Sequence, residues 1–357
     1  MMRILFYDPL TAFPYDAELM KKRGIGGTES SVIRVAEGLS RSHEVAVAQR
    51  AREEPAVGNP RLRYVPLDFP TPFQASPPDW VVVLRKHRSV PKLRTRFPDA
   101  ALALWIHNWQ RAEVVIHRIG LAKSRCIVVA VSDAHRKATD RRINGVPAKL
   151  IGRLAGDGQP IPVQRIYNPV DIPTPAEEFP VDPDKLLFFS TANKGLDQVL
   201  RTFQKVRNAI PSMKLYIAGE TLESLKNNPR YSDLLLEQPG VTLLGRLPQR
   251  ELFAHIRESL CVFYPQNIHP ETFGLVFAES NALGTPVLAH DFGAAGEVLC
   301  DRDQLVAAND TPAIIDRLRR WRNGERPSVY LREGLKLDAV VSEWQSLFEK
   351  FGPNPHR

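Results

Sequence analysis

Short apolar runs alternate with amphipathic helical patterns along almost the whole sequence, and this alternation constrains the fold more than any other feature. Strands of parallel sheets are covered by helices on both faces, so they read as continuous apolar runs. The chain contains two series of such runs, the first at residues 3–7, 45–48, 80–84, 101–106 and 127–131, the second at 186–189, 214–218, 241–244, 260–264 and 286–289. The pattern predicts an α/β protein with two parallel sheets.

A chain of 357 residues exceeds what one hydrophobic core usually supports, so two domains are expected. A proline-rich passage at 169–183 separates the two series, and frequent prolines forbid helix and disfavour central strands. We therefore predict one domain over residues 1–170 and a second over 171–339. Apolar residues then recur every three or four positions across 340–351, which predicts an amphipathic terminal helix.

Neither membrane spans nor disulfides are indicated. No apolar stretch has the length that a span needs, and the opening residues MMRILFYDPL suit a buried strand better than a signal peptide. We expect a cytoplasmic protein. The chain has only three cysteines, Cys126, Cys261 and Cys300, without disulfide or zinc-ligand spacing, which favours buried free thiols.

Positive charge is concentrated in the first half of the chain. Residues 1–170 contain 27 Lys and Arg against 15 Asp and Glu, whereas the remainder contains 21 against 25. The basic clusters indicate either a solvated surface or contact with nucleic acid, anionic lipid or a phosphorylated acceptor; they lie at 21–23, 85–88, 92–96 and 136–142. No nucleic-acid-binding motif accompanies them, so we expect no nucleic acid partner and keep peripheral contact with the inner face of an anionic membrane as a hypothesis.

A candidate anion site follows the predicted strand at 260–264. If a helix begins close to Phe273, the first amides of that helix, at Gly274, Leu275 and Val276, lack intrahelical acceptors and carry the positive end of the helix dipole. Such an end suits a diphosphate. Glu279 would lie about one turn into the helix, within reach of ribose hydroxyls, and Glu271 would lie on the sugar side. The alternative is that Glu271 only caps the helix and Glu279 is a solvated helix residue.

The residues around this spacing, PETFGLVFAESNALGTPVLAHDFGAAGEVL, resemble the donor-site signature of the family-4 retaining glycosyltransferases, also called glycosyl transferases group 1. The resemblance implies the GT-B fold, in which two Rossmann-like domains face each other across a cleft and the terminal helix crosses back onto the first domain. It also implies that Glu271 contacts the donor sugar, that Glu279 contacts the nucleotide ribose, and that residues 272–275 (Thr272, Phe273, Gly274 and Leu275) bind the donor.

Other segments extend the resemblance. Asn193-Lys194-Gly195 is similar to the family's Lys-Gly motif, in which the lysine binds donor phosphate; this chain lacks the arginine that often precedes it, and Arg246 is a candidate substitute. A solvated lysine is the alternative for Lys194.

In the first domain, Gly26-Gly27 resembles the loop that approaches the phosphates, and a helix capped by Thr28 or Ser30 is expected to follow it. Glu29 stands where a dinucleotide fingerprint needs its third glycine, which argues against an NAD site. His107 matches a histidine that touches the donor sugar in the family, with a core histidine as the alternative.

The resemblance implies metal-independent transfer of a hexose-type sugar from a nucleoside diphosphate sugar to an acceptor hydroxyl, with an α-linked product and no cofactor. Glu271, Lys194 and His107 are the expected catalytic residues, and the acceptor is a glycan, a lipid-linked sugar or a small molecule. The DxD sequences at 182–184 and 301–303 are expected to be ordinary acidic turns. Two alternatives stay open: another GT-B enzyme of sugar nucleotides, such as an epimerase, and a non-catalytic sugar-nucleotide-binding protein at a membrane surface.

Overall fold

A computed structural model describes residues 1–22, 24–69, 73, 76–154, 156, 159–172, 180–226, 228, 231 and 238–352. The chain forms two compact units: unit 1 contains Met1–Ala17, Gly26–Pro169 and Gly334–Arg357, and unit 2 contains Glu18–Ile25 and Val170–Glu333. Residues 173–179 of the predicted proline-rich connection and Arg23 of a predicted basic cluster lie outside the described residues. Glu18–Ile25, which the sequence places in the first domain, belongs to unit 2, where Gly24 lies against the carbonyl of Leu247.

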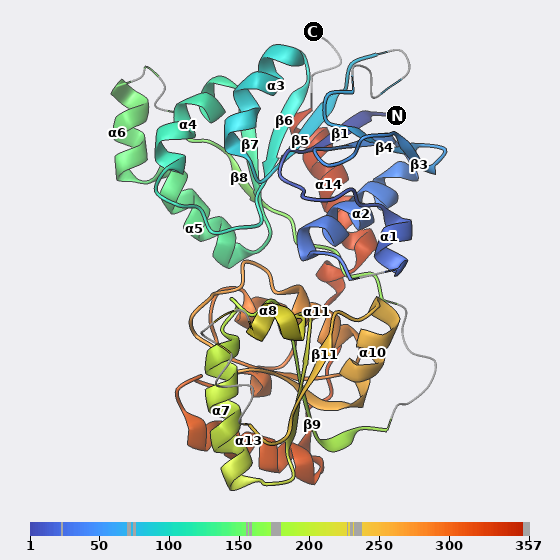
Figure 1. Ribbon diagram of the computed structural model, residues 1–357. Coiled ribbons are helices and arrows are strands. Elements are labelled where there is room, and N and C mark those ends of the chain that lie inside the picture. Colours follow the sequence, from blue (N-terminus) through green and yellow to red (C-terminus); the bar gives the residue numbers. More distant parts are fainter. Residues whose placement is uncertain are drawn as a thin grey trace. The chain divides into compact units, whose positions relative to one another are not determined.

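Unit 1 is built on an eight-stranded sheet with the strand order β3-β4-β2-β1-β5-β6-β7-β8. All neighbouring pairs are parallel except β3 with β4 (Figure 1). The strands are β1 (Arg3–Asp8), β2 (Glu44–Gln49), β3 (Ala56–Asn59), β4 (Leu62–Pro66), β5 (Trp80–Leu84), β6 (Ala101–Trp105), β7 (Cys126–Ala130) and β8 (Val163–Arg165). The five predicted strands occupy the interior, where continuous apolar runs are expected, and the three additional strands lie at the two edges.

The helices of unit 1 are α2 (Gly27–Ser40), α3 (Val90–Arg96), α4 (Val114–Lys123), α5 (Asp133–Asn144), α6 (Val146–Leu154) and α14 (Leu337–Phe351), and α1 (Ala17–Lys22) lies mostly in unit 2. The terminal helix α14 packs beside α2, as Figure 1 shows in red and blue. Its Trp344 is fully buried, with its ring 5.0 Å from that of Trp105 and 6.3 Å from that of Phe6. The helix is therefore part of the core of unit 1 although it comes last in the sequence.

Unit 2 has a five-stranded, fully parallel sheet with the order β11-β10-β9-β12-β13. Its strands are β9 (Asp182–Phe189), β10 (Lys214–Ala218), β11 (Val241–Gly245), β12 (Ser259–Tyr264) and β13 (Val287–Ala289). The helices are α7 (Leu196–Ala209), α8 (Leu222–Lys226), α10 (Gln249–Glu258), α11 (Leu275–Ala282), α12 (Ala295–Val298) and α13 (Thr311–Arg320). Each unit thus has a largely or wholly parallel sheet with helices between its strands, and the predicted fold class is confirmed.

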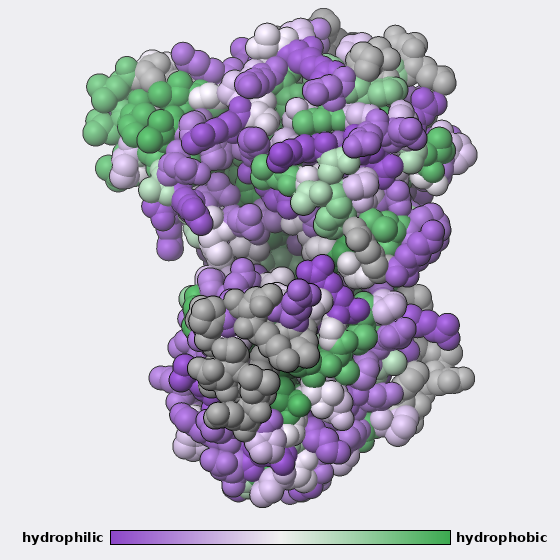
Figure 2. Space-filling view, in the orientation of Figure 1, coloured by the Kyte–Doolittle hydropathy of each residue, from purple (hydrophilic) through white to green (hydrophobic). Residues whose placement is uncertain are grey.

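The surface is mostly hydrophilic in the view of Figure 2, and one group of apolar side chains lies over α6, at the upper left. None of the helices in the described part of the chain is both long and apolar enough to cross a bilayer. Cys126 and Cys261 are buried, as expected for structural thiols, whereas Cys300 is only partly buried.

Candidate functional site

The carboxyl ends of β9 and β12 meet at the centre of the sheet of unit 2, because these two strands are neighbours and parallel. The segment after β9 carries Lys194 and leads into α7, and the segment after β12 carries Glu271 and leads into α11. In open parallel sheets, ligands bind at this edge. The topology therefore brings together two segments that are separated in the sequence by two further strands, β10 and β11, and the helices between them.

Glu271 is the centre of the polar contacts at this edge. Its side chain is nearly buried, and its carboxylate has one partner on each oxygen. Lys194 Nζ donates to Oε2 at 2.8 Å, and the Tyr264 hydroxyl donates to Oε1 at 2.7 Å. The Lys194 side chain is 34% exposed, so the ammonium lies between this buried acid and solvent.

Tyr264 ends the buried strand β12 and holds Glu271 from the core side. Burial raises the pKa of Tyr264 well above its usual value, and the adjacent Glu271 carboxylate adds to the effect. The ring stacks on Phe188 and meets Phe277 edge-on, each at 5.5 Å between centroids. The phenol is therefore a fixed hydrogen-bond donor. The sequence analysis missed this role; a phenol that closes an apolar strand directly before the motif is the signal for it.

The loop between β12 and Glu271 is held by Gln266, which is also nearly buried. Its side-chain oxygen accepts from the amides of Ile268 and His269, each at 2.9 Å, and its side-chain nitrogen donates to the carbonyl of His269. Gln198 of α7 accepts from the amide of Asn267 at 3.0 Å. The loop that presents Glu271 is thus tied to the helix that begins just after Lys194.

The helix α11 begins at Leu275, with Gly274 as its N-cap, close to the predicted start. Gly274 has φ +84°, and a Cβ there would come within 2.5 Å of the Phe277 ring. The requirement for glycine is therefore conformational. The first amides of α11 lack intrahelical acceptors, and they open on the same sheet edge as Glu271.

The remaining residues of the predicted motif differ in exposure. Phe273 is buried, so only its backbone can face a ligand, whereas Thr272, Leu275 and Glu279 are partly exposed. Glu271 also forms a parallel bridge with Gly293, and its carbonyl accepts from the amide of Ala294 at 3.0 Å. The glycine-containing turn after β13 therefore braces the backbone of Glu271.

Asn193 and Arg246 are both exposed. The side-chain oxygen of Asn193 accepts from the Thr191 hydroxyl at 2.6 Å, which shapes the turn before Lys194. Arg246 follows β11, the edge strand of the sheet, two strands away from β9. No contact between Arg246 and Lys194 occurs among the described residues, so its role as a second phosphate cation stays a prediction.

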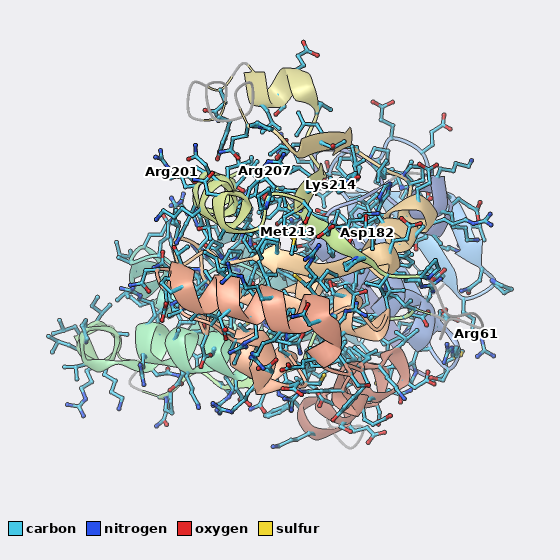
Figure 3. All side chains as sticks on the ribbon, turned by 90° about the horizontal axis from the view of Figure 1, so that it is seen from below. Arg61, Asp182, Arg201, Arg207, Met213 and Lys214 are labelled. Atoms are coloured by element: carbon cyan, nitrogen blue, oxygen red, sulfur yellow. The ribbon has the colours of Figure 1, made fainter. Side chains whose placement is uncertain are left out.

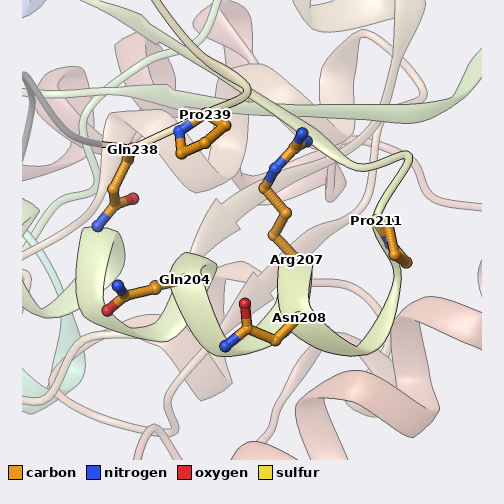
Figure 4. A pocket seen from close by; sticks show the side chains of 6 residues that line it. All are labelled: Gln204, Arg207, Asn208, Pro211, Gln238 and Pro239. Carbon is orange, nitrogen blue, oxygen red and sulfur yellow. The ribbon is translucent and has the colours of Figure 1, made fainter.

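Two cavities lie on unit 2. One, of about 330 Å³, borders the turn at Thr191–Asn193 and is closed on its other side by residues that include Glu220 and Tyr231. The other, of about 390 Å³, lies between the end of α7 and the Gln238–Pro239 turn (Figure 4). That end of the unit carries Arg207, Met213 and Lys214, labelled in Figure 3, and β10 starts there. The larger cavity is thus at the amino edge of the sheet, opposite the edge where parallel sheets bind ligands.

The carboxylates of the two DxD sequences are held by other side chains of unit 2. Asp184 accepts a hydrogen bond from Arg322 at 2.7 Å. Burial by itself would raise the pKa of Asp184, but the hydrogen bonds from Arg322 and Ser212 outweigh burial, so the pKa is lowered. Asp303 accepts from Trp321 and Arg320. Asp301 accepts from the backbone amide of Asp303 and caps a short helical turn over Arg302–Gln304, as expected for an acidic turn. Asp182 likewise accepts from the amide of Asp184, but both residues lie in β9, so the predicted turn is wrong there.

In unit 1, α2 begins at Gly27 with Gly26 as N-cap and without a side-chain cap, so the expected cap by Thr28 or Ser30 is wrong. The two glycines are therefore the start of the helix itself. Ser30 instead donates to the carbonyl of Gly27. A Cβ on Gly26 would collide with the Glu29 carboxylate, which folds back over the helix start. An acid near the first amides is stabilised by the helix dipole.

Arg85 was predicted as part of a basic surface cluster, but its side chain is largely buried and points inward. It donates to both oxygens of Asp8, which is fully buried, at 2.9 and 3.0 Å, and to Glu29 at 3.2 Å. The Tyr15 hydroxyl donates to Asp8 at 3.0 Å. This network joins the carboxyl ends of β1 and β5 to the first turn of α2, next to Gly26 and Gly27.

His107 follows β6 and is nearly buried. Burial lowers the pKa of His107 well below its usual value, and the positive charge of Arg85 and the neighbouring His135 act in the same direction. The imidazole is therefore neutral at physiological pH. A shared site of His107, Gly26 and Gly27 in unit 1 with Lys194 and Glu271 in unit 2 stays a prediction.

Comparison with known proteins gives concordant matches. Residues 175–336 match the model of the family glycosyl transferases group 1. The segment that aligns with phosphatidyl-myo-inositol mannosyltransferase of Mycobacterium leprae (strain TN) is 31% identical over 137 residues, or 36% of this chain and 34% of that protein. A GDP-mannose-dependent alpha-(1-6)-phosphatidylinositol monomannoside mannosyltransferase of Mycolicibacterium smegmatis (strain ATCC 700084 / mc(2)155) is 27% identical over 34% of this chain and 33% of its own length. The chain thus spans about a third of each of these curated relatives.

The match to solved structures extends over both units. Sucrose-phosphate synthase from Thermosynechococcus elongatus superposes with a TM-score of 0.68 at 14% identity, covering 98% of this chain and 99% of that one. This likeness concerns the fold, and the family match concerns the segment that contains Lys194, Glu271 and Glu279. Over residues 175–336 the chain therefore matches the glycosyl transferases group 1 family, and it has the GT-B fold.

Proposed function

We propose that this protein is a retaining hexosyltransferase that moves a sugar from a nucleoside diphosphate sugar to an acceptor hydroxyl. The observation that carries the proposal is the pairing of Lys194 with the nearly buried Glu271 beside the start of α11. A cation, an acid and a set of helix amides at one sheet edge match the parts of such a donor: a diphosphate, and a sugar with hydroxyl groups. The family match over residues 175–336 supports this assignment.

In the proposed reaction, the bond between the anomeric carbon and the diphosphate breaks, and the acceptor oxygen forms a new bond on the same face of the sugar. The leaving diphosphate oxygen takes the acceptor proton. Lys194 and the first amides of α11 stabilise the charge that develops on the diphosphate. Glu271, held by Tyr264, positions the sugar hydroxyls, and Glu279 accepts from the ribose. The product is an α-glycoside.

The names of the relatives supply the first substrates to test. One relative is named as GDP-mannose-dependent, and both are named as acting on phosphatidylinositol derivatives. We therefore put GDP-mannose first among donors and a lipid-linked polyol or sugar first among acceptors. The basic first half of the chain supports peripheral contact with the inner face of an anionic membrane. No metal step is needed in this proposal, so chelation of divalent ions should leave turnover unchanged.

The test is donor binding followed by donor turnover. A thermal-shift screen over UDP, GDP, ADP and CDP sugars should identify one nucleotide, because a ligand at a hundred times its dissociation constant adds about 2.7 kcal/mol of stability. With that donor, Glu271→Gln should lower turnover by at least about 100-fold, as expected when a group aimed at the reacting sugar is lost. Glu251→Gln, an exposed acid on α10, is the matched control and should have no effect. Donor binding without any turnover in the native protein would refute the transferase and favour a binding protein.

A further inference from the structure

The helix α6 turns its apolar side chains to solvent. Of its nine residues, Val146–Leu154, only Ala148 and Gly152 are buried. Val146, Leu150 and Leu154 are 81%, 60% and 82% exposed. Figure 2 shows this apolar group over α6 on an otherwise mostly hydrophilic face. A small exposed hydrophobe alone needs no explanation, but three in register on one short helix do.

The three side chains form one stripe on the outer side of α6. Residues four apart lie one above the other on a helix, so Val146, Leu150 and Leu154 share one line along it. The buried residues Ala148 and Gly152 lie on the opposite side, where α6 packs on α4 and α5. Because both are small, the helix sits close to its neighbours and presents the full stripe outward. We call these three residues the apolar stripe.

The apolar stripe lies in a segment with only positive charges. Between residues 141 and 154 the sequence has four basic residues, Arg141, Arg142, Lys149 and Arg153, and no acidic one. All four are exposed. Lys149 directly precedes Leu150 and Arg153 directly precedes Leu154, so both basic residues flank the stripe on the same side of the helix. Apolar side chains beside exposed basic side chains are the pattern of helices that lie in the interface of an anionic bilayer.

The geometry points to α6 as the element by which unit 1 binds an anionic membrane: we propose that the apolar stripe enters the headgroup boundary while Lys149, Arg153, Arg141 and Arg142 contact lipid phosphates. A second copy of the chain is a poorer partner for this surface, because the four basic residues of one copy would lie against the same four of the other and repel them. A single stripe of three side chains also falls short of the area that a stable dimer needs. The proposal rests on the membrane contact proposed above and does not depend on the donor chemistry of unit 2.

The test is co-flotation of the whole protein with vesicles. The native protein should float with vesicles of phosphatidylcholine mixed with phosphatidylglycerol, less with phosphatidylcholine alone, and less as salt is raised. The triple variant Val146→Ser, Leu150→Ser and Leu154→Ser should bind mixed vesicles at least about 30-fold more weakly. The double variant Lys149→Gln and Arg153→Gln should lose roughly 30-fold at low salt and much less at high salt. All five positions are exposed, so the fold should be retained.

Two matched controls lie in or next to the strands of the same unit. Val57→Ser on β3 removes an equally exposed aliphatic side chain, and the double variant Arg50→Gln and Arg63→Gln removes two exposed charges. Both controls should bind vesicles like the native protein. Equal losses in the stripe variant and in Val57→Ser would overturn the proposal. So would failure of the native protein to float, or a dimer in solution that only the stripe variant dissociates.

The membrane proposal and the transferase proposal fail separately. Donor turnover, measured without vesicles, should be unchanged in the stripe variant, and Glu271→Gln should float like the native protein. Loss of flotation with full turnover assigns α6 to the membrane without affecting the donor site. Turnover that is absent in the native protein would refute the transferase while leaving the vesicle result intact.

Discussion

The contact between Tyr264 and Glu271 gives the sharpest prediction for the candidate site. Tyr264→Phe removes one oxygen and keeps the ring, whose contacts with Phe188 and Phe277 are purely aromatic. The change removes the hydrogen bond of 2.7 Å to Glu271 Oε1, together with the hydrogen bond between the phenol oxygen and the Ser190 side chain. Packing should be preserved because the two side chains differ little in volume.

The expected cost follows from the charge and burial of Glu271. A hydrogen bond to a charged group contributes about 1.5–3 kcal/mol, and Glu271 is only 8% exposed, so solvent cannot replace the phenol. The Lys194 ion pair remains in place, which keeps the loss below the roughly 3–5 kcal/mol of a fully unpaired buried charge. We expect the free energy of unfolding to fall by about 2 kcal/mol. We expect kcat/KM for the donor to fall at least about tenfold, because Glu271 then samples other rotamers.

Urea unfolding and donor kinetics measure the two effects. The matched control is Tyr64→Phe in unit 1: Tyr64 is also fully buried, and its hydroxyl has no partner among the described residues. That change should be neutral or slightly stabilising, since it removes a polar atom buried without a hydrogen bond. If Tyr264→Phe costs no more stability than Tyr64→Phe and leaves kcat/KM unchanged, the phenol does not position Glu271 and the reasoning is refuted.

Two further predictions concern conformation and pH. Gly274→Ala should lower the free energy of unfolding by at least about 2 kcal/mol, because the new Cβ would clash with the Phe277 ring. Gly284→Ala is the control: Gly284 has φ +76° but no atom within 4 Å of an added Cβ, so the change should cost only about 1 kcal/mol. Equal melting temperatures of the two variants would contradict the Phe277 clash. Burial lowers the pKa of His135 in the folded protein to about 4. Between pH 6.5 and 4 the His135 imidazole is therefore neutral in the folded protein, whereas in the unfolded chain, where its pKa is near 6.5, it is protonated. Stability should therefore fall as pH drops from about 6.5 to 4, by up to about 3 kcal/mol from this group, and denaturant unfolding of His135→Gln should show a shallower acid slope.

The alternation of apolar runs determined the fold class. A strand that is buried on both faces is a continuous apolar run in the sequence, whichever strands it pairs with. All five predicted strands of unit 2 are accordingly present. The strands β3, β4 and β8 of unit 1 were not predicted. Two of them, β3 and β8, are edge strands, which are held by one neighbour rather than by continuous burial. Helix starts were less certain: α11 begins where the sequence suggested, whereas α2 begins earlier because Gly26 takes an extended N-cap conformation.

The sequence by itself pointed to Lys194 and Glu271 through their resemblance to a family motif, but it said nothing of the distance between them. Only the tertiary structure placed Lys194 Nζ 2.8 Å from Glu271 Oε2. The strands β9 and β12 are neighbours in space, although β10, β11 and their helices lie between them in the sequence. The tertiary structure likewise turned Arg85 from a surface charge into a buried partner of Asp8, and it turned the apolar stripe of α6 outward. Periodicity along a chain records how each element is buried, whereas contacts between distant residues depend on which strands pair, and that is decided by the fold as a whole.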